Sequence, residues 1–157
     1  MATVQSTYSE LQPIGQAGMP ASGDFSADTR NCETSAGIGF GVAVSQGSGD
    51  LGAVIGGASA AVFVGVTMAD KSVPNDGGAD GYNQYDSMGV MTRGRIWVVT
   101  GGIVTAGGDV TFAATTGVLS SAATGGSQFA IAGARWMTGA ASGAVALLQL
   151  GGALPSA

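Results

Sequence analysis

Residues 60–68 read AAVFVGVTM and give the clearest strand signal in the chain. Apolar and β-branched residues alternate over most of this stretch, which is typical of a β-strand. The alternation predicts two faces, with Val62, Val64, Val66 and Met68 on one and Phe63, Gly65 and Thr67 on the other. A polar stretch rich in Asp, Asn and Gly follows over residues 71–85 and predicts a long surface loop.

Residues 90–99 read VMTRGRIWVV and predict a second long strand, with a possible break at Gly94. Alternation places four side chains on one of its faces: Arg93, Arg95, Trp97 and Val99. This face combines charged and apolar side chains, and an arginine side chain on it can lie across the indole ring.

Shorter strand signals continue outward along the chain, separated by turns rich in Gly. We expect strands at residues 38–45, 109–113 and 145–150, and a hairpin of 129–131 and 135–138 that turns at Gly133. The Ala-rich window 139–150 is the rival for a helix, but its two glycines each lower helix propensity by about 1 kcal/mol relative to Ala. The pattern predicts an all-β fold, a small β-barrel or β-sandwich.

Residues 1–35 show no periodic pattern and contain several Pro and Gly. We expect an extended N-terminal arm over 1–35 and a compact β domain over 36–157, with no core element before residue 36. The apolar residues of the arm are well spaced for docking on another chain, although packing along its own domain is the alternative. Those residues include Tyr8, Leu11, Ile14 and Met19.

The composition is rich in Gly and poor in charge. Of 157 residues, 29 are Gly and 10% are charged, against 45% that are hydrophobic. So many glycines leave a thin core for this length, and oligomerisation is the usual remedy for a thin core. Apolar surface would then be buried against partner chains as well as inside the subunit.

Charge excludes two classes of partner. The net charge is −5 and only five residues are basic. Nucleic-acid binding depends on a basic surface that neutralises phosphates, so no nucleic-acid partner is expected. The chain also lacks a polybasic stretch, a long apolar span and a signal peptide, so no membrane partner is expected.

The single cysteine, Cys32, cannot form an internal disulfide and is expected to be buried.

The residues of most catalytic sites are missing. The chain has no His, which removes the Ser-His-Asp and Cys-His arrangements and most catalytic zinc sites. Asp76, Asp80 and Asp86 share one loop and could offer oxygen ligands to calcium. Their spacing does not match a known calcium loop, and a solvated acidic loop is the simpler interpretation. We therefore expect no enzyme, no cofactor and no metal site.

Each tryptophan closely follows an arginine: Trp97 comes two residues after Arg95 on a strand, and Trp136 directly follows Arg135. Trp and Arg are enriched at energetically important positions of protein interfaces. The alternative for each pair is a Trp at the edge of the core with its Arg reaching to solvent. The candidate protein-interface residues are Tyr8, Leu11, Ile14, Met19, Arg93, Arg95, Trp97, Arg135 and Trp136.

Several of these motifs, taken in order, resemble the structural cement (decoration) proteins of tailed bacteriophages. The matching pieces are Gly18-Met19, GFGVAVSQG (39–47), FVGV (63–66), GRIWV (94–98), GDV (108–110), ARWMT (134–138) and GAVALLQL (143–150). The resemblance implies a compact β domain that forms a homotrimer. It implies attachment to the outer surface of the capsid, where the subunit clamps neighbouring copies of the major capsid protein.

Two other classes of function stay open at this stage. One is an adhesin-type module on a phage or cell surface that binds glycans, with Trp97, Tyr82 and Tyr85 as a stacking platform. The other is a metal-dependent hydrolase built on the loop from Asp76 to Asp86.

Overall fold

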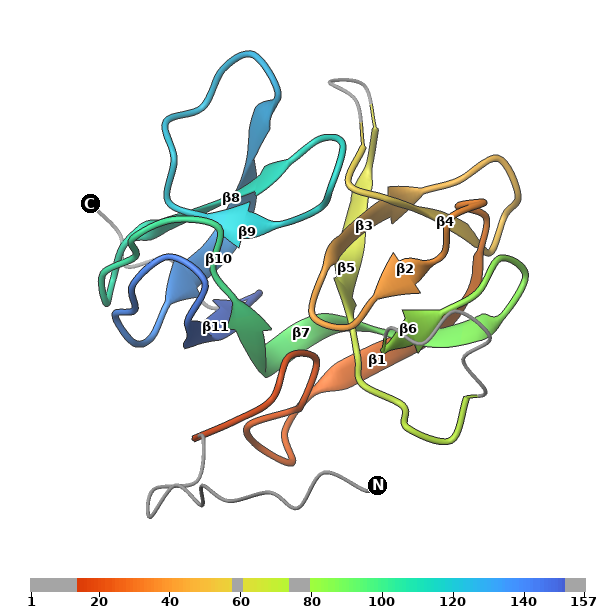
Figure 1. The fold of residues 1–157 in the computed structure, drawn as a ribbon, viewed down its shortest axis with the longest axis horizontal. Helices are drawn as coiled ribbons and strands as arrows, with labels where there is room; N and C mark the ends of the chain where they lie inside the picture. The colour runs from red at the N-terminus through yellow and green to blue at the C-terminus, as the bar shows by residue number, and fades with distance from the viewer. Residues whose placement is uncertain (1–13, 58–60, 74–79, 152–157) are drawn as a thin grey trace, which may run out of the picture.

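The computed structural model describes residues 14–57, 61–73 and 80–151, and these contain β-strands and no helix (Figure 1). The strands are β1 (Ser26–Cys32), β2 (Ile38–Gly39), β3 (Ala43–Gln46), β4 (Gly52–Ile55), β5 (Phe63–Thr67), β6 (Gly81–Tyr82), β7 (Ser87–Val99), β8 (Asp109–Ala113), β9 (Leu119–Ser120), β10 (Gln128–Trp136) and β11 (Val145–Leu150). None of the described residues belongs to a helix long and apolar enough to cross a membrane.

Five strands close a barrel. The order β1-β4-β3-β5-β7 is completed by a direct pairing of β1 with β7, so the ring has no open edge. The β2–β6 ribbon lies beside this barrel (Figure 1). Closure removes the unpaired edges that would otherwise invite aggregation. The all-β barrel prediction is confirmed.

Strand β7 belongs to two sheets. Its first half pairs with β1 and β5, and residues 94–99 pair with β11, which continues through β10 and β8 to β9. The change occurs at Gly94, whose φ of 126° is open to glycine but strained for other residues. A bridge between Thr100 and Leu119 then links the far end of the second sheet back to the end of β7. Figure 1 shows β7 running between the two halves of the molecule.

The two halves have separate cores on opposite sides of the barrel wall. Neighbouring residues of one strand face different cores: Val44 and Val90 point into the barrel, whereas Ala43 and Met91 join the larger core. The buried members of that larger core are Ala43, Val66, Met91, Ile96, Val98, Val104, Val110, Phe112, Leu119, Ile131, Ala134, Trp136, Ala146, Leu148 and Leu150.

Four local expectations were wrong. The strand expected over residues 38–45 is divided into β2 and β3, which lie in different sheets. Alternation along β5 is interrupted because Ser45 pairs with Phe63 and Val44 with Gly65, leaving Val64 as an extra, bulged residue. The bulge reverses the alternation, so Phe63 packs on the same core as Val66 while Val64 packs on the other.

The expected hairpin at Gly133 does not form, and β10 continues through this position as one strand. Its pairing with β8 shifts register between Ala130 and Arg135, and Gly133 has a φ of 75°. The glycine therefore accommodates an irregularity within a strand, where the sequence suggested a chain reversal.

A strand also lies within the segment assigned to the arm. Residues 26–32 form β1, which pairs antiparallel with β7 and parallel with β4. The expectation that no core element precedes residue 36 was wrong, because Cys32 is fully buried in the barrel core.

Candidate binding surface

The outer face of the second sheet brings together most of the predicted interface residues. Along β7 the buried side chains of Ile96 and Val98 alternate with outward-facing positions. Arg93, Arg95 and Val99 are exposed, and Trp97 is half-buried between them. Regular alternation over residues 95–99 places Arg95, Trp97 and Val99 on one face, whereas Arg93 lies before the change of sheet at Gly94 and pairs with Ser26 of β1.

Strand pairing extends the surface across the sheet. Arg95 lies opposite Gln149 of β11, and Gln149 lies opposite Arg135 of β10. Directly opposed residues in antiparallel strands place their Cβ atoms about 5 Å apart on the same face. We call the set Arg93, Arg95, Arg135, Trp97 and Gln149 the arginine face.

The cations of the arginine face have no carboxylate partner in the part of the chain that the structure describes. Among the described residues, neither an ion pair within 4 Å nor a hydrogen bond involves the guanidinium groups of Arg93, Arg95 and Arg135. The Nε atom of Arg135 and the Oε1 atom of Gln149 are both buried and unpartnered in this part of the chain. Arg95 and Arg135 thus lie on one sheet face, and Arg93 lies next to it across Gly94, so three of the five basic residues of an acidic protein are close together.

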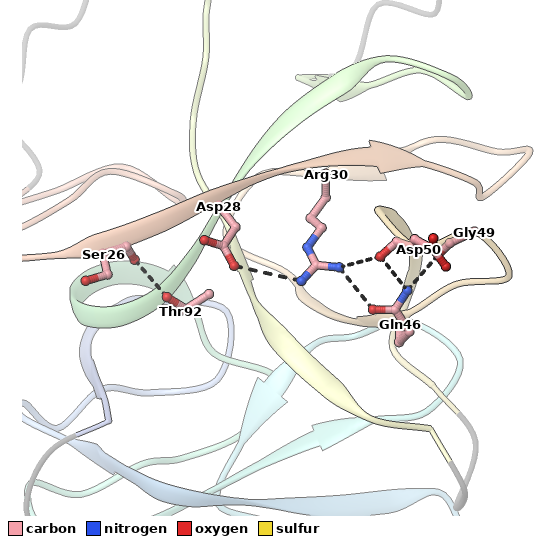
Figure 2. A network of polar contacts seen from close by, with 7 residues as sticks. All are labelled: Ser26, Asp28, Arg30, Gln46, Gly49, Asp50 and Thr92. Carbon is pink, nitrogen blue, oxygen red and sulfur yellow. Dashed lines mark hydrogen bonds and ion pairs between the residues drawn. The ribbon is translucent and has the colours of Figure 1, made fainter.

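The other two basic residues are engaged within the fold. Figure 2 shows Arg30 held beside Asp28 and donating to Gln46 at 3.0 Å and to the Asp50 carbonyl at 3.3 Å. Lys71 pairs with Asp80. Arg30 is therefore part of the barrel's own structure, whereas the cations of the arginine face form no such contacts with the described residues.

Part of the arm lies against this surface. The Gly18 amide donates to the Trp97 carbonyl at 2.8 Å, and the Trp97 amide donates to Met19 at 3.0 Å. A Cβ on Gly15 would lie 2.4 Å from Cγ of Trp97, so only glycine permits this close packing on the indole ring. Residues 15–21 therefore pack along their own domain, which was the alternative to docking on a neighbour.

Two arm residues of the predicted interface still face solvent at the edge of the arginine face. Ile14 is 83% exposed and Met19 is 39% exposed. Tyr8 and Leu11 lie outside the described residues. Trp136 points from β10 into the larger core and is 0% exposed, so we leave it out of the surface. Its neighbour Arg135 faces the opposite way, as strand alternation requires.

Gln149 is the member of the surface that the sequence analysis missed. Its signal was the alternation of the last strand, where Ala146, Leu148 and Leu150 are buried and the residues between them are half-buried. Which strand lies beside β11 could not be known from that alternation.

The residues of the glycan-binding alternative do not form one platform. Tyr82 is 2% exposed, and its hydroxyl donates to the Met68 carbonyl at 2.7 Å. Burial raises the pKa of this hydroxyl. Tyr85 is exposed in a turn with a φ of 72°. A stacking surface made of Trp97, Tyr82 and Tyr85 is therefore excluded.

The acidic loop shows no assembled metal site within the described residues, where no three His, Cys, Asp or Glu side chains cluster. Asp80 pairs with Lys71, and Asp86 accepts the Asn83 amide at 2.7 Å. Asp76, the third proposed ligand, lies outside the described residues. Cys32 is buried, and desolvation raises the pKa of its thiol.

Comparison with known proteins agrees with this architecture. The family model described as structural cement protein (E217 gp24/Pam3 gp6) matches residues 4–151. A chain from the capsid of Myoviridae phage XM1 has a similar fold, with a TM-score of 0.76 and 15% identity over 99% of this chain and 100% of that one. The base of head fibre gp8.5 from bacteriophage phi29 aligns with a TM-score of 0.47 and 13% identity over 84% and 99% of the two chains. Among curated proteins there is no match.

Proposed function

Because the chain belongs to the structural cement protein family, we propose that it binds the outer surface of its phage capsid and clamps neighbouring major capsid proteins. A structural role in the virion follows from the family, and members of a structural family act by binding rather than by catalysis. The position on the outside and the clamping of neighbours are the further steps of the proposal.

The arginine face carries the proposal. It is an outward sheet surface with three guanidinium groups that have no ion pair among the described residues. Arginine and tryptophan are the residue types that most often dominate binding energy. Charge attraction to such a face would speed the association of a partner with complementary negative charge and would fix its orientation on the surface.

Repetition would supply the strength of the clamp. An interface of ordinary size buries about 1,600 Å² in total. When a homotrimer engages several sites at once, avidity exceeds the affinity of each contact by about 10² to 10⁴. We propose this homotrimer because apolar side chains such as Ile103, at 78% exposure, remain uncovered in the single chain. Tyr8 and Leu11 would add contacts to a neighbouring chain.

Binding of the purified chain to capsids that lack it tests the proposal. The variant Arg95→Glu reverses one charge on the arginine face, and Lys71→Glu makes the same change of charge elsewhere on the molecule. We expect Arg95→Glu to weaken co-sedimentation with capsids by about tenfold or more, because a repulsive charge replaces an attractive one. Lys71→Glu should bind like the wild type. Equal binding by both variants and the wild type would refute the role of this face.

A further inference from the structure

We infer that the arginine face contains a carboxylate-binding pocket, formed by Arg93, Arg95 and Gln149, that receives an Asp or Glu side chain of the capsid partner. This inference rests on the proposed function, because it assigns the chemistry of the group that the face recognises. It differs from general charge attraction, since it requires directed hydrogen bonds to one acceptor.

The pocket is a polar hollow beside the point where β7 changes sheets. Arg93, Gly94 and Arg95 line it from β7, and residues 149–151 line it from the end of β11 and beyond. Ser22 and Asp24 close it from the N-terminal segment. Backbone pairing of Gln149 with Arg95 and of Leu150 with Gly94 fixes the two strand walls relative to each other.

The two guanidinium groups of this hollow have no acceptor among the described residues. Arg93 and Arg95 flank Gly94 on β7, and both line the hollow. The amide side chain of Gln149 also forms no hydrogen bond among the described residues; its buried Oε1 atom is an acceptor, so only its Nε2 group can donate to a ligand. Within this part of the chain, two guanidinium groups and the Nε2 group of Gln149 therefore lack a shared acceptor.

A carboxylate fits this donor set better than other anions. The planar fork of a guanidinium matches the two oxygens of a carboxylate. A nucleic-acid phosphate is disfavoured because the chain carries a net charge of −5. Asp24 borders the hollow but lies beyond 4 Å from both guanidinium groups, so the chain's own carboxylate does not occupy it.

Arginine Nε–H resonances provide the test, because the chain has four arginines and therefore four such signals. The full-length protein would be titrated with glutarate at pH 6.5, with sodium chloride at matched ionic strength as the control. We expect the Arg93 and Arg95 signals to shift saturably with glutarate only. Arg30, held by Gln46 and Asp50, is the internal control and should not move.

Two variants sharpen the titration. Arg95→Gln should weaken glutarate binding by about tenfold or more, because a charged hydrogen-bond donor is lost. Asp24→Asn should tighten it by about two- to threefold, since a negative charge at the border of the hollow would no longer repel the ligand.

Uniform drift of all four signals, or tighter binding of inorganic phosphate than of glutarate, would overturn the carboxylate pocket. If that happened while Arg95→Glu still abolished capsid binding, the arginine face would keep its proposed function and only the pocket would be lost. If glutarate bound as expected but Arg95→Glu bound capsids normally, the proposed function would fail instead.

Discussion

Gly94→Ala is the substitution that most directly probes how β7 joins the two halves of the fold. The residue has a φ of 126°, and an added Cβ would lie 2.5 Å from Cβ and 3.0 Å from Cα of Phe25. A side chain at positive φ costs about 1–2 kcal/mol. Forcing a methyl group into occupied space adds about 1–3 kcal/mol. This steric cost becomes smaller if the segment around Phe25 shifts to make room. We expect Gly94→Ala to lower the free energy of unfolding by about 2–4 kcal/mol.

Urea denaturation followed by tryptophan fluorescence measures this change, since it yields both the unfolding free energy and its denaturant dependence. Gly89→Ala is the matched control on the same strand, because its Cβ would lie at an ordinary 3.8 Å from Met68 and its φ is not positive. That variant should be neutral or more stable by about 0.4–1 kcal/mol. Equal stability of Gly94→Ala and Gly89→Ala would refute the reasoning about the strand switch.

Four further outcomes are expected. Trp136→Ala should destabilise the protein by about 3–5 kcal/mol in the same denaturation assay, whereas Trp97→Ala should cost less because its ring is only half-buried. The Glu33 carboxylate accepts the Ser48 and Gly49 amides at 2.7 and 2.8 Å, and these bonds lower its pKa below the usual 4.5. The stabilisation of the folded state by the ionised Glu33 carboxylate is therefore fully present above pH 4.5 and is lost as the pH falls through the lowered pKa. Protection of the Ser48 and Gly49 amides from hydrogen exchange should follow this titration, and Glu33→Gln should abolish that effect of the carboxylate. The buried Cys32 thiol, with its raised pKa, should react with iodoacetamide only when the protein unfolds, and rapid labelling of folded protein would contradict its burial. Deleting residues 1–13 should weaken capsid binding while leaving the unfolding free energy unchanged, and full binding by the truncated chain would exclude Tyr8 and Leu11 from the interface.

Strands whose apolar side chains alternate were predictable from the sequence. The expected segments 109–113 and 145–150 are the observed β8 and β11, and 90–99 lies within β7. Burial of one face is sufficient to produce this signal. The barrel class was likewise predictable from many short strands and glycine-rich turns.

Strand β1 could not be predicted because its sequence, SADTRNC, has no apolar alternation and most of its side chains are exposed. It becomes a strand because β4 and β7 offer backbone partners, which is a tertiary effect. The bulge at Val64 has the same origin, since register depends on the neighbouring strand.

The candidate surface was predictable only within each strand. Alternation grouped Arg93, Arg95 and Trp97, but the same rule could not tell which side of a strand faces the core. Trp97 comes two residues after Arg95 and Trp136 directly follows Arg135, but neither spacing shows which tryptophan faces the core; Trp136 fills the larger core, and Trp97 lies beneath Gly15. The position of Arg135 two strands away from Arg95 required the strand order.

Cryo-electron microscopy of the virion that carries this chain is the decisive experiment for the proposed capsid clamp. We expect three-lobed density on the outside of the capsid, over junctions between major capsid proteins, with the outer face of β7, β10 and β11 turned toward the shell. Density that places Arg93, Arg95 and Arg135 in open solvent, or a capsid without this chain on its surface, would contradict it.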